Sequence, residues 1–185
     1  MNDRLLLYLV GPPGVGKSTV MAELTRRCRR ELSPKPFAHD HLYTDDLEPV
    51  GMELGRRRAT FSGTDALGMS VQPRAVEWIA SRPHRLVLGE GARLGTVGFL
   101  TAARTAGYRV LLVHLSAPED VLERRRALRG SSQSPAWMRG AETRAQRLAD
   151  RMALDADVHR ISGNAPAVDL AQRIATLDER LAVLC

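Results

Sequence analysis

The feature that most constrains this chain is a turn rich in glycine and proline, which lies between two apolar patterns in LLLYLVGPPGVGKSTVMAEL, residues 5–24. The apolar residues 5–10 predict a buried strand, and Val20, Met21 and Leu24 recur at helical spacing. A tight turn from a strand into a helix points consecutive main-chain N–H groups, and the positive end of the helix, at one place. The stretch therefore predicts an anion-binding turn.

Residues 11–18, GPPGVGKS, match the pattern G-x-x-x-x-G-K-[ST] in the strand–turn–helix context that it requires. In such a turn Lys17 contacts the β and γ phosphates of ATP, and the Ser18 hydroxyl helps to hold Mg²⁺. Only two of the 27 basic residues are lysines, and a compact ammonium suits this cradle better than the wide guanidinium fork. The residues expected to bind the nucleotide here are Gly11, Pro12, Pro13, Gly14, Val15, Gly16, Lys17, Ser18 and Thr19.

The remaining sequence alternates apolar runs with helical patterns. Strands are predicted at residues 5–10, 37–42, 85–89, 109–115 and 158–161, and helices at 18–30, 64–80, 99–106, 118–128 and 136–152. A last helix is indicated by the apolar stripe Leu170, Ile174, Leu177 and Leu181. Nearly continuous apolar runs are typical of parallel strands that are covered on both faces. We therefore expect one α/β domain over residues 1–185, with the three-layer P-loop NTPase fold and a mainly parallel five-stranded sheet.

Two segments are harder to assign from pattern. The region that follows the second strand, through residue 61, has the Gly, Pro and Arg content of a mobile loop or substrate flap. Pro73 is expected to kink the helix 64–80.

Two acidic residues are candidates for the catalytic carboxylates that would determine which reaction takes place. Glu90 ends the apolar strand in LVLGEGARLG, where a carboxylate beside the cradle could orient Mg²⁺ or accept a proton; the alternative is a solvated turn residue. Asp65 follows Ser-Gly-Thr at a predicted helix start, where it either serves the helix terminus or faces the acceptor together with Gln72 and Arg74. Both carboxylates remain candidates for the general base.

An arginine-rich helix is predicted before the polar turn GSSQSP, and its basic residues are Arg124, Arg125, Arg126 and Arg129. A lid over residues 124–147 could fold arginines over the migrating phosphoryl group and exclude water. Helical spacing places Arg125 and Arg129 on one face, so we expect these two to reach the phosphates. The alternative is a solvated basic face that pairs with acidic residues of the same helix.

Two further motifs have a functional and a structural interpretation. In RISGNAPA, Gly163 and Asn164 either present their backbone to the edge of adenine or simply form a strand–helix turn. HDHLYTDD gathers His and Asp residues, but its spacing matches none of the strong zinc patterns, so a polar loop is expected.

Composition limits the setting and the partners. The net charge of +6 and the pI near 10.1 favour polyanionic partners, although coding bias toward arginine is an equal explanation. The apolar run 5–10 is too short to span a bilayer, so neither a membrane segment nor a signal peptide is expected. The two cysteines show no metal-ligand spacing, which favours a reducing, cytoplasmic setting.

With the cradle, Glu90, the arginine-rich segment and SGNAPA in place, the chain resembles the nucleoside and nucleotide kinase branch of the P-loop fold. Glu90 and Arg93 resemble the Glu-x-x-Arg arrangement of deoxynucleoside kinases, although Gly-Ala-Arg follows Glu90 and the Glu-Arg-Ser tripeptide of those enzymes is missing. ELGRRRATFSGTDALGMSVQP and SSQSPAWMRGAETR are similar to segments of actinobacteriophage P-loop proteins. Some phage P-loop kinases phosphorylate 5-hydroxymethyluracil in DNA.

The resemblance implies an Mg·ATP-dependent kinase with Lys17, Asp65, Glu90, Arg93, Arg125 and Arg129 as candidate catalytic residues, and Ser18 and Glu90 as candidate metal ligands. The acceptor would be a hydroxyl or phosphate on a nucleotide or on DNA. A kinase of a small metabolite or antibiotic is the alternative within enzymes. Two alternatives lie outside the kinases. The protein could be a nucleotide-dependent switch that acts through a partner, or a DNA-binding protein without catalysis, since both fit a basic chain with a nucleotide cradle.

Overall fold

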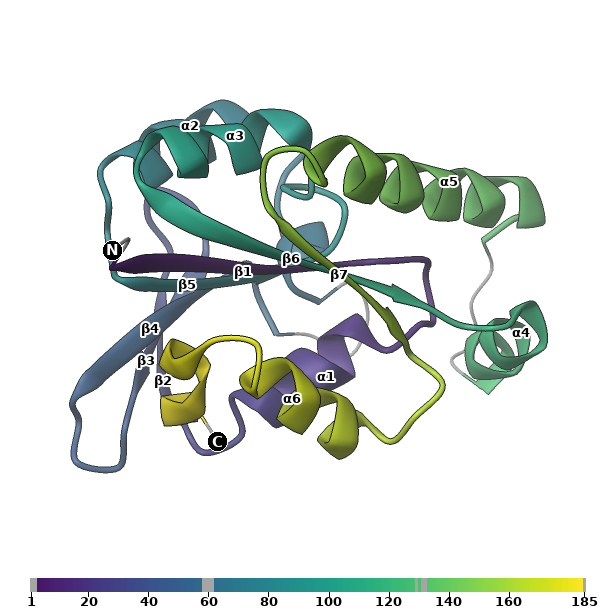
Figure 1. Ribbon diagram of the computed structural model, residues 1–185, viewed down its shortest axis with the longest axis horizontal. Helices are drawn as coiled ribbons and strands as arrows, with labels where there is room; N and C mark the ends of the chain where they lie inside the picture. Colours follow the sequence, from purple (N-terminus) through teal and green to yellow (C-terminus); the bar gives the residue numbers. More distant parts are fainter. Residues whose placement is uncertain (1–2, 58–61, 129, 131–132, 185) are drawn as a thin grey trace.

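The computed structural model describes residues 3–57, 62–128, 130 and 133–184, and Figure 1 shows helices on both faces of one sheet. The strands are β1 (Arg4–Val10), β2 (Arg29–Ser33), β3 (His39–Tyr43), β4 (Pro49–Leu54), β5 (Leu86–Glu90), β6 (Tyr108–Ser116) and β7 (Asp157–Ser162). The α-helices are α1 (Lys17–Leu24), α2 (Gln72–Ala80), α3 (Val97–Thr105), α4 (Glu119–Leu128), α5 (Pro135–Met152) and α6 (Ala167–Ala175). Two 3₁₀ helices are η1 (Thr64–Ala66) and η2 (Glu179–Leu184).

The described strands form a 7-stranded sheet in the order β2-β3-β4-β5-β1-β6-β7. β4, β5, β1, β6 and β7 run parallel to one another, whereas β3 is antiparallel to β4 and β2 is antiparallel to β3 at one edge. The predicted α/β fold with a mainly parallel sheet is confirmed, but the prediction of five strands was wrong. β2 and β4 are the two strands that the sequence pattern did not reveal.

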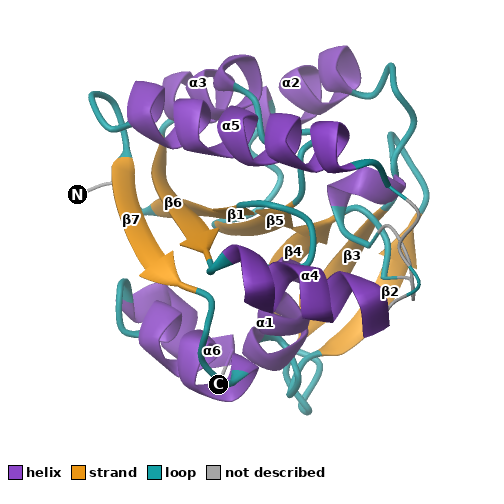
Figure 2. Cartoon of the chain, turned by 90° about the vertical axis from the view of Figure 1, so that its right-hand side faces the viewer, coloured by secondary structure: helices purple, strands orange, loops and turns teal. Residues whose placement is uncertain are grey.

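Each face of β1 belongs to a separate apolar core. Leu5, Leu7 and Leu9 pack with α1 and α6 on one side, and Leu6 and Tyr8 pack with α2, α3 and α5 on the other. Figure 2 shows these two helical layers above and below the sheet, with α4 in front of the strand ends. Because both faces are covered, the strand is apolar at nearly every position, as expected for a central parallel strand. The predicted three layers are therefore present.

The helix predicted over residues 18–30 ends much earlier, since α1 stops at Leu24. The hydroxyl of Thr25 donates to the carbonyl of Met21 at 2.8 Å, and the chain then turns into β2. Arg30 on β2 pairs with Asp40 at 2.7 Å and also with Glu53, both of which are buried in the sheet extension. Pairing with distant carboxylates thus overrides the local helical pattern.

The segment after β3 is also more regular than expected. Residues 44–54 form a turn and the strand β4 in place of an irregular loop. HDHLYTDD lies mostly on β3 in place of a polar loop. Residues 58–61 of the expected flap lie outside the described residues. β2 and β4 are short and carry charged residues, Arg30 and Glu53, whose partners lie elsewhere in the chain, so the local pattern did not reveal these two strands.

Pro73 does not kink a long helix but stands in the first turn of α2. A proline is tolerated there because its missing N–H has no intrahelical partner in any case. The segment before Pro73 forms the separate 3₁₀ helix η1. Gly63, which precedes η1, has a φ of +64°, and Leu67, which follows it, is extended. The predicted helix 64–80 is therefore two elements.

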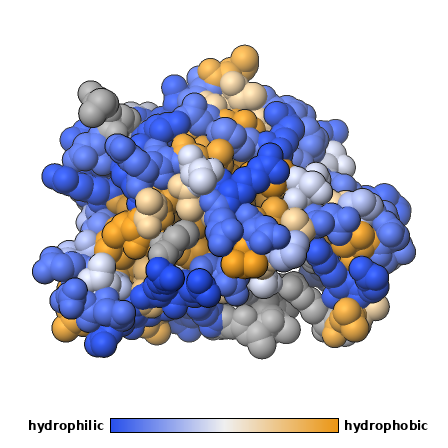
Figure 3. Space-filling model, turned by 60° about the horizontal axis from the view of Figure 1, so that its bottom comes forward, coloured by the Kyte–Doolittle hydropathy of each residue, from blue (hydrophilic) through white to orange (hydrophobic). Residues whose placement is uncertain are grey.

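Within the described part of the chain, no helix combines the length and the apolar character needed to cross a membrane. On the face seen in Figure 3, apolar side chains lie in separate patches among hydrophilic ones.

Candidate active site

The turn between β1 and α1 has the backbone conformation that its glycines permit. Gly11, Gly14 and Gly16 have φ values of +149°, +87° and +103°, which side-chain-bearing residues rarely adopt. A Cβ atom at Gly11 would lie 2.3 Å from the carbonyl oxygen of Leu115 on β6. The glycines therefore allow the turn to curl tightly against β6 and to open directly into α1.

Lys17, the first residue of α1, folds back over this turn. Its Nζ donates to the carbonyl of Gly11 at 2.9 Å and to that of Pro12 at 3.1 Å. The ammonium group thus lies at the mouth of the glycine-rich turn, where the motif requires a cation.

Glu90 stands at the carboxyl end of β5, the strand next to β1. Its Oε1 accepts a hydrogen bond of 2.7 Å from the hydroxyl of Ser18, and the residue is only 2% exposed. Burial raises the pKa of Glu90 to about 7, although the Lys17 ammonium and the Ser18 hydroxyl act in the opposite direction. A hydroxyl and a carboxylate oxygen side by side are donors that suit Mg²⁺.

Three residues that the sequence did not indicate hold Glu90 in place. The Thr64 hydroxyl donates to the main-chain carbonyl of Glu90 at 2.8 Å, and the Tyr8 hydroxyl lies 2.9 Å from Thr64 Oγ1. A Cβ atom at Gly63 would lie 2.3 Å from Oε1 of Glu90, so only glycine leaves room for the carboxylate. These contacts join segments that are far apart in the chain, and no local pattern could have revealed them.

Asp65 lies in η1 and reaches the loop that follows β5. Its Oδ1 accepts from the backbone N–H of Ala92 at 2.8 Å and from that of Arg93 at 3.1 Å. Asp65 therefore anchors the loop that follows Glu90 and carries Arg93. Of its expected neighbours, Gln72 lies beside Gly98 at the start of α3, and Arg74 is exposed.

Arg93 is half-buried, three residues beyond Glu90. Its Nη1 contacts the sulfur of Met69, whereas its Nε is buried and has no hydrogen-bond partner. The structure thus places Arg93 at the same edge of the sheet as the cradle.

The arginines of α4 have different environments. Arg125 donates through Nη1 to the carbonyls of Val15 at 3.2 Å and Gly163 at 3.0 Å, so it bridges the glycine-rich turn and the loop after β7. Arg126 is buried behind Gly14 and pairs with Glu119, so it does not belong to a solvated basic face. Arg124 is exposed, and Arg129 lies outside the described residues.

A pocket of about 340 Å³ opens beside the turn. Its walls come from the turn, α1, α4 and the loop into α6, and its lining residues are Gly14, Val15, Gly16, Thr19, Val20, Arg125, Leu128, Gly163, Ala165, Pro166, Ala167 and Leu170. Gly163 lines this pocket, whereas Asn164 does not. The apolar residues of α6 were not predicted to line a site, because their helical stripe indicated packing alone.

The His and Asp residues of HDHLYTDD have structural neighbours. The ring centroid of His39 lies 5.8 Å from that of Phe37 and 5.2 Å from that of Trp78. Asp40 pairs with Arg30. Burial lowers the pKa of His39. Among residues 3–57, 62–128, 130 and 133–184, no group of three or more His, Cys, Asp or Glu side chains is placed to hold a metal ion.

Comparison with known proteins agrees with this arrangement. A family model described as P-loop nucleotide kinase 3 matches residues 1–167. The ribose 1,5-bisphosphate phosphokinase PhnN of Desulfomicrobium baculatum is 27% identical, over 93% of this chain and 92% of that protein. The PhnN of Methylobacterium radiotolerans is 28% identical, over 69% of this chain and 75% of that protein.

An unliganded sugar kinase from Janibacter has the same fold, with a TM-score of 0.51 at 13% identity and coverage of 98% of both chains. The α/β P-loop kinase fold that the sequence predicted is therefore confirmed, and so is the prediction of a phosphotransferase. The chain belongs to the P-loop nucleotide kinase 3 family and is a phosphotransferase.

Proposed function

We propose that the protein is an ATP-dependent kinase whose acceptor is a small molecule. The observation that carries the proposal is the 2.7 Å hydrogen bond from Ser18 to Glu90, formed where a glycine-rich turn opens a helix. It places a hydroxyl and a carboxylate beside Lys17, and this set of groups is the one that Mg·ATP chemistry requires.

The nucleotide would lie along the turn, with its phosphates on the backbone N–H groups of residues 11–19. Lys17 now donates to the carbonyls of Gly11 and Pro12, and in the complex it would turn to the β and γ phosphates. The base would enter the pocket of about 340 Å³, where Gly163 forms part of the wall and Arg125 bridges its two sides. The exposed Asn164 would lie at the rim of this site.

Ser18 would hold Mg²⁺, which when bound neutralises charge on the β and γ phosphates, and Glu90 would orient the ion through a water molecule, which leaves its carboxylate able to accept a proton. The side-chain oxygens of both residues lie at the end of the cradle that faces β5. Glu90 is kept there by Thr64 and by the space at Gly63.

In the reaction an acceptor oxygen forms a bond to the γ phosphorus while the bond from that phosphorus to the β–γ bridging oxygen breaks, and ADP leaves. A hydroxyl acceptor gives its proton to a carboxylate, whereas an ionised phosphate oxygen has no proton to give. Glu90 is the better candidate for this base, because Oδ1 of Asp65 already accepts two backbone N–H groups. Lys17 stabilises the charge of the transferred group.

We also infer that residues 1–185 act as one domain in which the segment 124–147 closes over the nucleotide as a lid. The contacts of Arg125 with both Val15 and Gly163 support this inference, because they already tie α4 to the cradle. Arg129 is part of the same proposed segment.

The class of acceptor is supported by the relatives. The two similar PhnN proteins are named for ribose 1,5-bisphosphate, a small phosphorylated sugar. DNA that contains 5-hydroxymethyluracil is a separate candidate, which a net charge of +6 also suits.

Transfer of labelled phosphate from ATP tests the proposal. The acceptor panel contains ribose 1,5-bisphosphate, ribose 5-phosphate, thymidine, dTMP, plain DNA and DNA with 5-hydroxymethyluracil, each with wild type and with Lys17→Met. We expect label in a small molecule and none with Lys17→Met. Label that appears only in DNA, with a rate that falls steeply as salt rises, would contradict a small acceptor. Label that appears only in inorganic phosphate would indicate a hydrolysing switch.

A further inference from the structure

Arg93 has no carboxylate partner among the described residues, in contrast to the enclosed Arg30 and Arg126. Arg30 pairs with Asp40 and Glu53, and Arg126 pairs with Glu119. In the part of the chain that the structure describes, no carboxylate oxygen lies within the 4.0 Å of a salt bridge from Arg93. No ion pair with a described residue therefore neutralises its positive charge.

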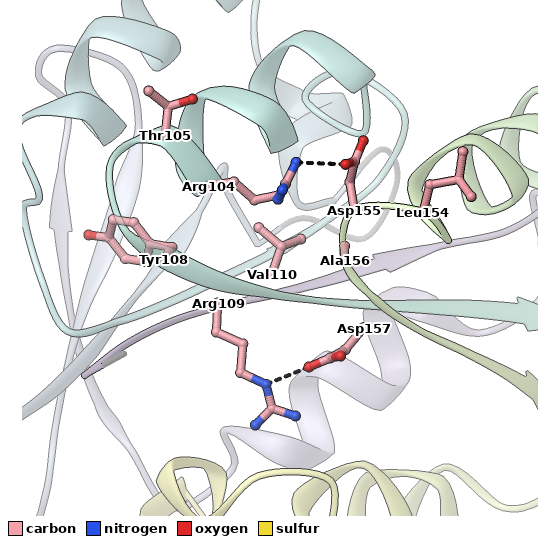
Figure 4. A pocket seen from close by; sticks show the side chains of 9 residues that line it. All are labelled: Arg104, Thr105, Tyr108, Arg109, Val110, Leu154, Asp155, Ala156 and Asp157. Carbon is pink, nitrogen blue, oxygen red and sulfur yellow. Dashed lines mark hydrogen bonds and ion pairs between the residues drawn. The ribbon is translucent and has the colours of Figure 1, made fainter. Parts of the chain in front are cut away.

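Another cavity among the described residues illustrates the contrast. It measures about 660 Å³ and lies at the amino ends of β6 and β7, at the opposite edge of the sheet from the cradle. Figure 4 shows its two arginines, Arg104 and Arg109, paired with Asp155 and Asp157. This cavity offers an anion no unpaired cation, whereas the loop after β5 does.

One edge of the Arg93 guanidinium has no hydrogen-bond partner among the described residues. Nη1 contacts the sulfur of Met69, while Nε is buried without a partner and Nη2 has none among the described residues. Nε and Nη2 share the edge from which two N–H groups point in parallel, and this spacing matches two oxygens of a phosphate. The thioether is a weak acceptor on a side chain that is 81% exposed, so an oxyanion can displace Met69.

The backbone of Arg93 is fixed next to the site of transfer. Oδ1 of Asp65 accepts from its N–H at 3.1 Å and from that of Ala92 at 2.8 Å. Glu90, three residues earlier, contacts Ser18 on the other side. The guanidinium therefore extends from a rigid loop at the carboxyl edge of β5, where an acceptor must lie to receive the γ phosphoryl group.

We propose that Arg93 binds a phosphate group of the acceptor, which makes the acceptor a phosphorylated small molecule; this inference rests on the kinase function proposed above. The guanidinium donates from Nε and Nη2 to two phosphate oxygens, and Met69 moves off the guanidinium as the anion arrives. A neutral sugar or nucleoside lacks the group that Arg93 is placed to bind.

The test measures anion binding separately from phosphoryl transfer. Protein saturated with Mg²⁺ and the non-hydrolysable ATP analogue AMP-PNP, which fills the cradle, is titrated by calorimetry with inorganic phosphate, ribose 5-phosphate and ribose. The variants are Arg93→Gln, Arg93→Lys and, as a matched control, Arg173→Gln on the exposed face of α6. We expect wild type and Arg173→Gln to bind both phosphates and to bind ribose far more weakly.

Arg93→Gln should weaken the binding of both phosphates about tenfold or more, because a charge-assisted pair of hydrogen bonds is lost. Arg93→Lys should recover only part of the affinity, since it keeps the charge but not the fork. Unchanged AMP-PNP affinity and thermal stability in Arg93→Gln exclude a merely structural effect. Failure of wild type to bind either phosphate, or equal binding by Arg93→Gln, overturns the inference. If wild type failed to bind AMP-PNP at all, the kinase proposal itself would be wrong.

Discussion

Gly63 determines whether a carboxylate can reach the phosphate-binding turn. Its φ of +64° and the position of its absent Cβ, 2.3 Å from Oε1 of Glu90, leave no other residue type room there. The sequence predicted Glu90 as the strand-end carboxylate and Lys17 as the cation of the cradle. It could not predict Gly63, Thr64 or Tyr8, because their contacts with Glu90 and its neighbours depend on how β1, η1 and β5 pack.

Gly63→Ala should push the carboxylate of Glu90 away from Ser18. A displacement of about 1 Å lowers phosphoryl transfer by roughly 100-fold, since catalytic groups act only in the correct geometry. Gly68→Ala in the same segment is the control, because no atom lies within 4 Å of its absent Cβ. Steady-state rates compare the two variants. Equal activity in both would mean that the contact between Ser18 and Glu90 does not matter for transfer.

Asp65→Asn separates an anchoring role of Asp65 from a role as general base. The amide oxygen of Asn can still accept from the N–H groups of Ala92 and Arg93, so we expect activity within a few-fold of wild type. Asp65→Leu loses both hydrogen bonds and should destabilise the fold by about 1–3 kcal/mol, with loss of activity. Loss of activity in Asp65→Asn with unchanged urea denaturation would instead assign Asp65 as the base.

At the level of helices and strands, the sequence predicted those elements whose own residues show a clear apolar periodicity. The strand 5–10, the start of α1 and the helices α3, α4 and α5 follow from apolar periodicity and are present. The pattern did not predict β2, β4 or the early end of α1, because these depend on antiparallel pairing and on the contacts of Arg30 with two distant carboxylates. The strands and carboxylates that take part in this pairing lie elsewhere in the sequence, so the residues of β2 and β4 alone give no sign of it.

The end of the chain is held by a buried carboxylate, Asp178. Its Oδ1 accepts from the N–H of Arg180 at 3.0 Å and from Nε of that residue at 2.7 Å, and its Oδ2 accepts from Arg109 at 2.7 Å. The hydrogen bonds from Arg180 hold the pKa of Asp178 below its ordinary value of 3.8. η2 is thereby joined to the beginning of β6.

This arrangement predicts a difference in acid stability between wild type and Asp178→Asn. Because the pKa of the carboxyl is lower in the folded state, its stabilisation is complete above the unfolded value and is lost as pH falls through the folded value. At pH 7 the variant should therefore be less stable by about 2 kcal/mol, and the difference should shrink below about pH 4. Urea denaturation over this pH range measures it. A difference that stays constant down to pH 3 would show that the ionisation of Asp178 does not contribute.

For the whole molecule, the strand order explains why distant segments meet at one site. β1 lies between β5 and β6, so the turn after β1 is flanked by Glu90 on one side and by Leu115 and Gly163 on the other. In a parallel sheet the carboxyl ends of neighbouring strands share one edge, which is where ligands bind. The motif GPPGVGKS predicted this edge as the site from a local pattern, whereas the seven-stranded extent of the sheet needed the structure.

The most direct test is the thermal stability of wild type and Lys17→Met with and without Mg·ATP. Ligand at 100 times its Kd stabilises the folded state by about 2.7 kcal/mol, which raises the Tm of a chain of this size by roughly 5–10 °C. We predict this rise for wild type and little or none for Lys17→Met, whose Tm without nucleotide should stay close to that of wild type. No rise in wild type, or an equal rise in both proteins, would contradict a phosphate-binding cradle at residues 11–18.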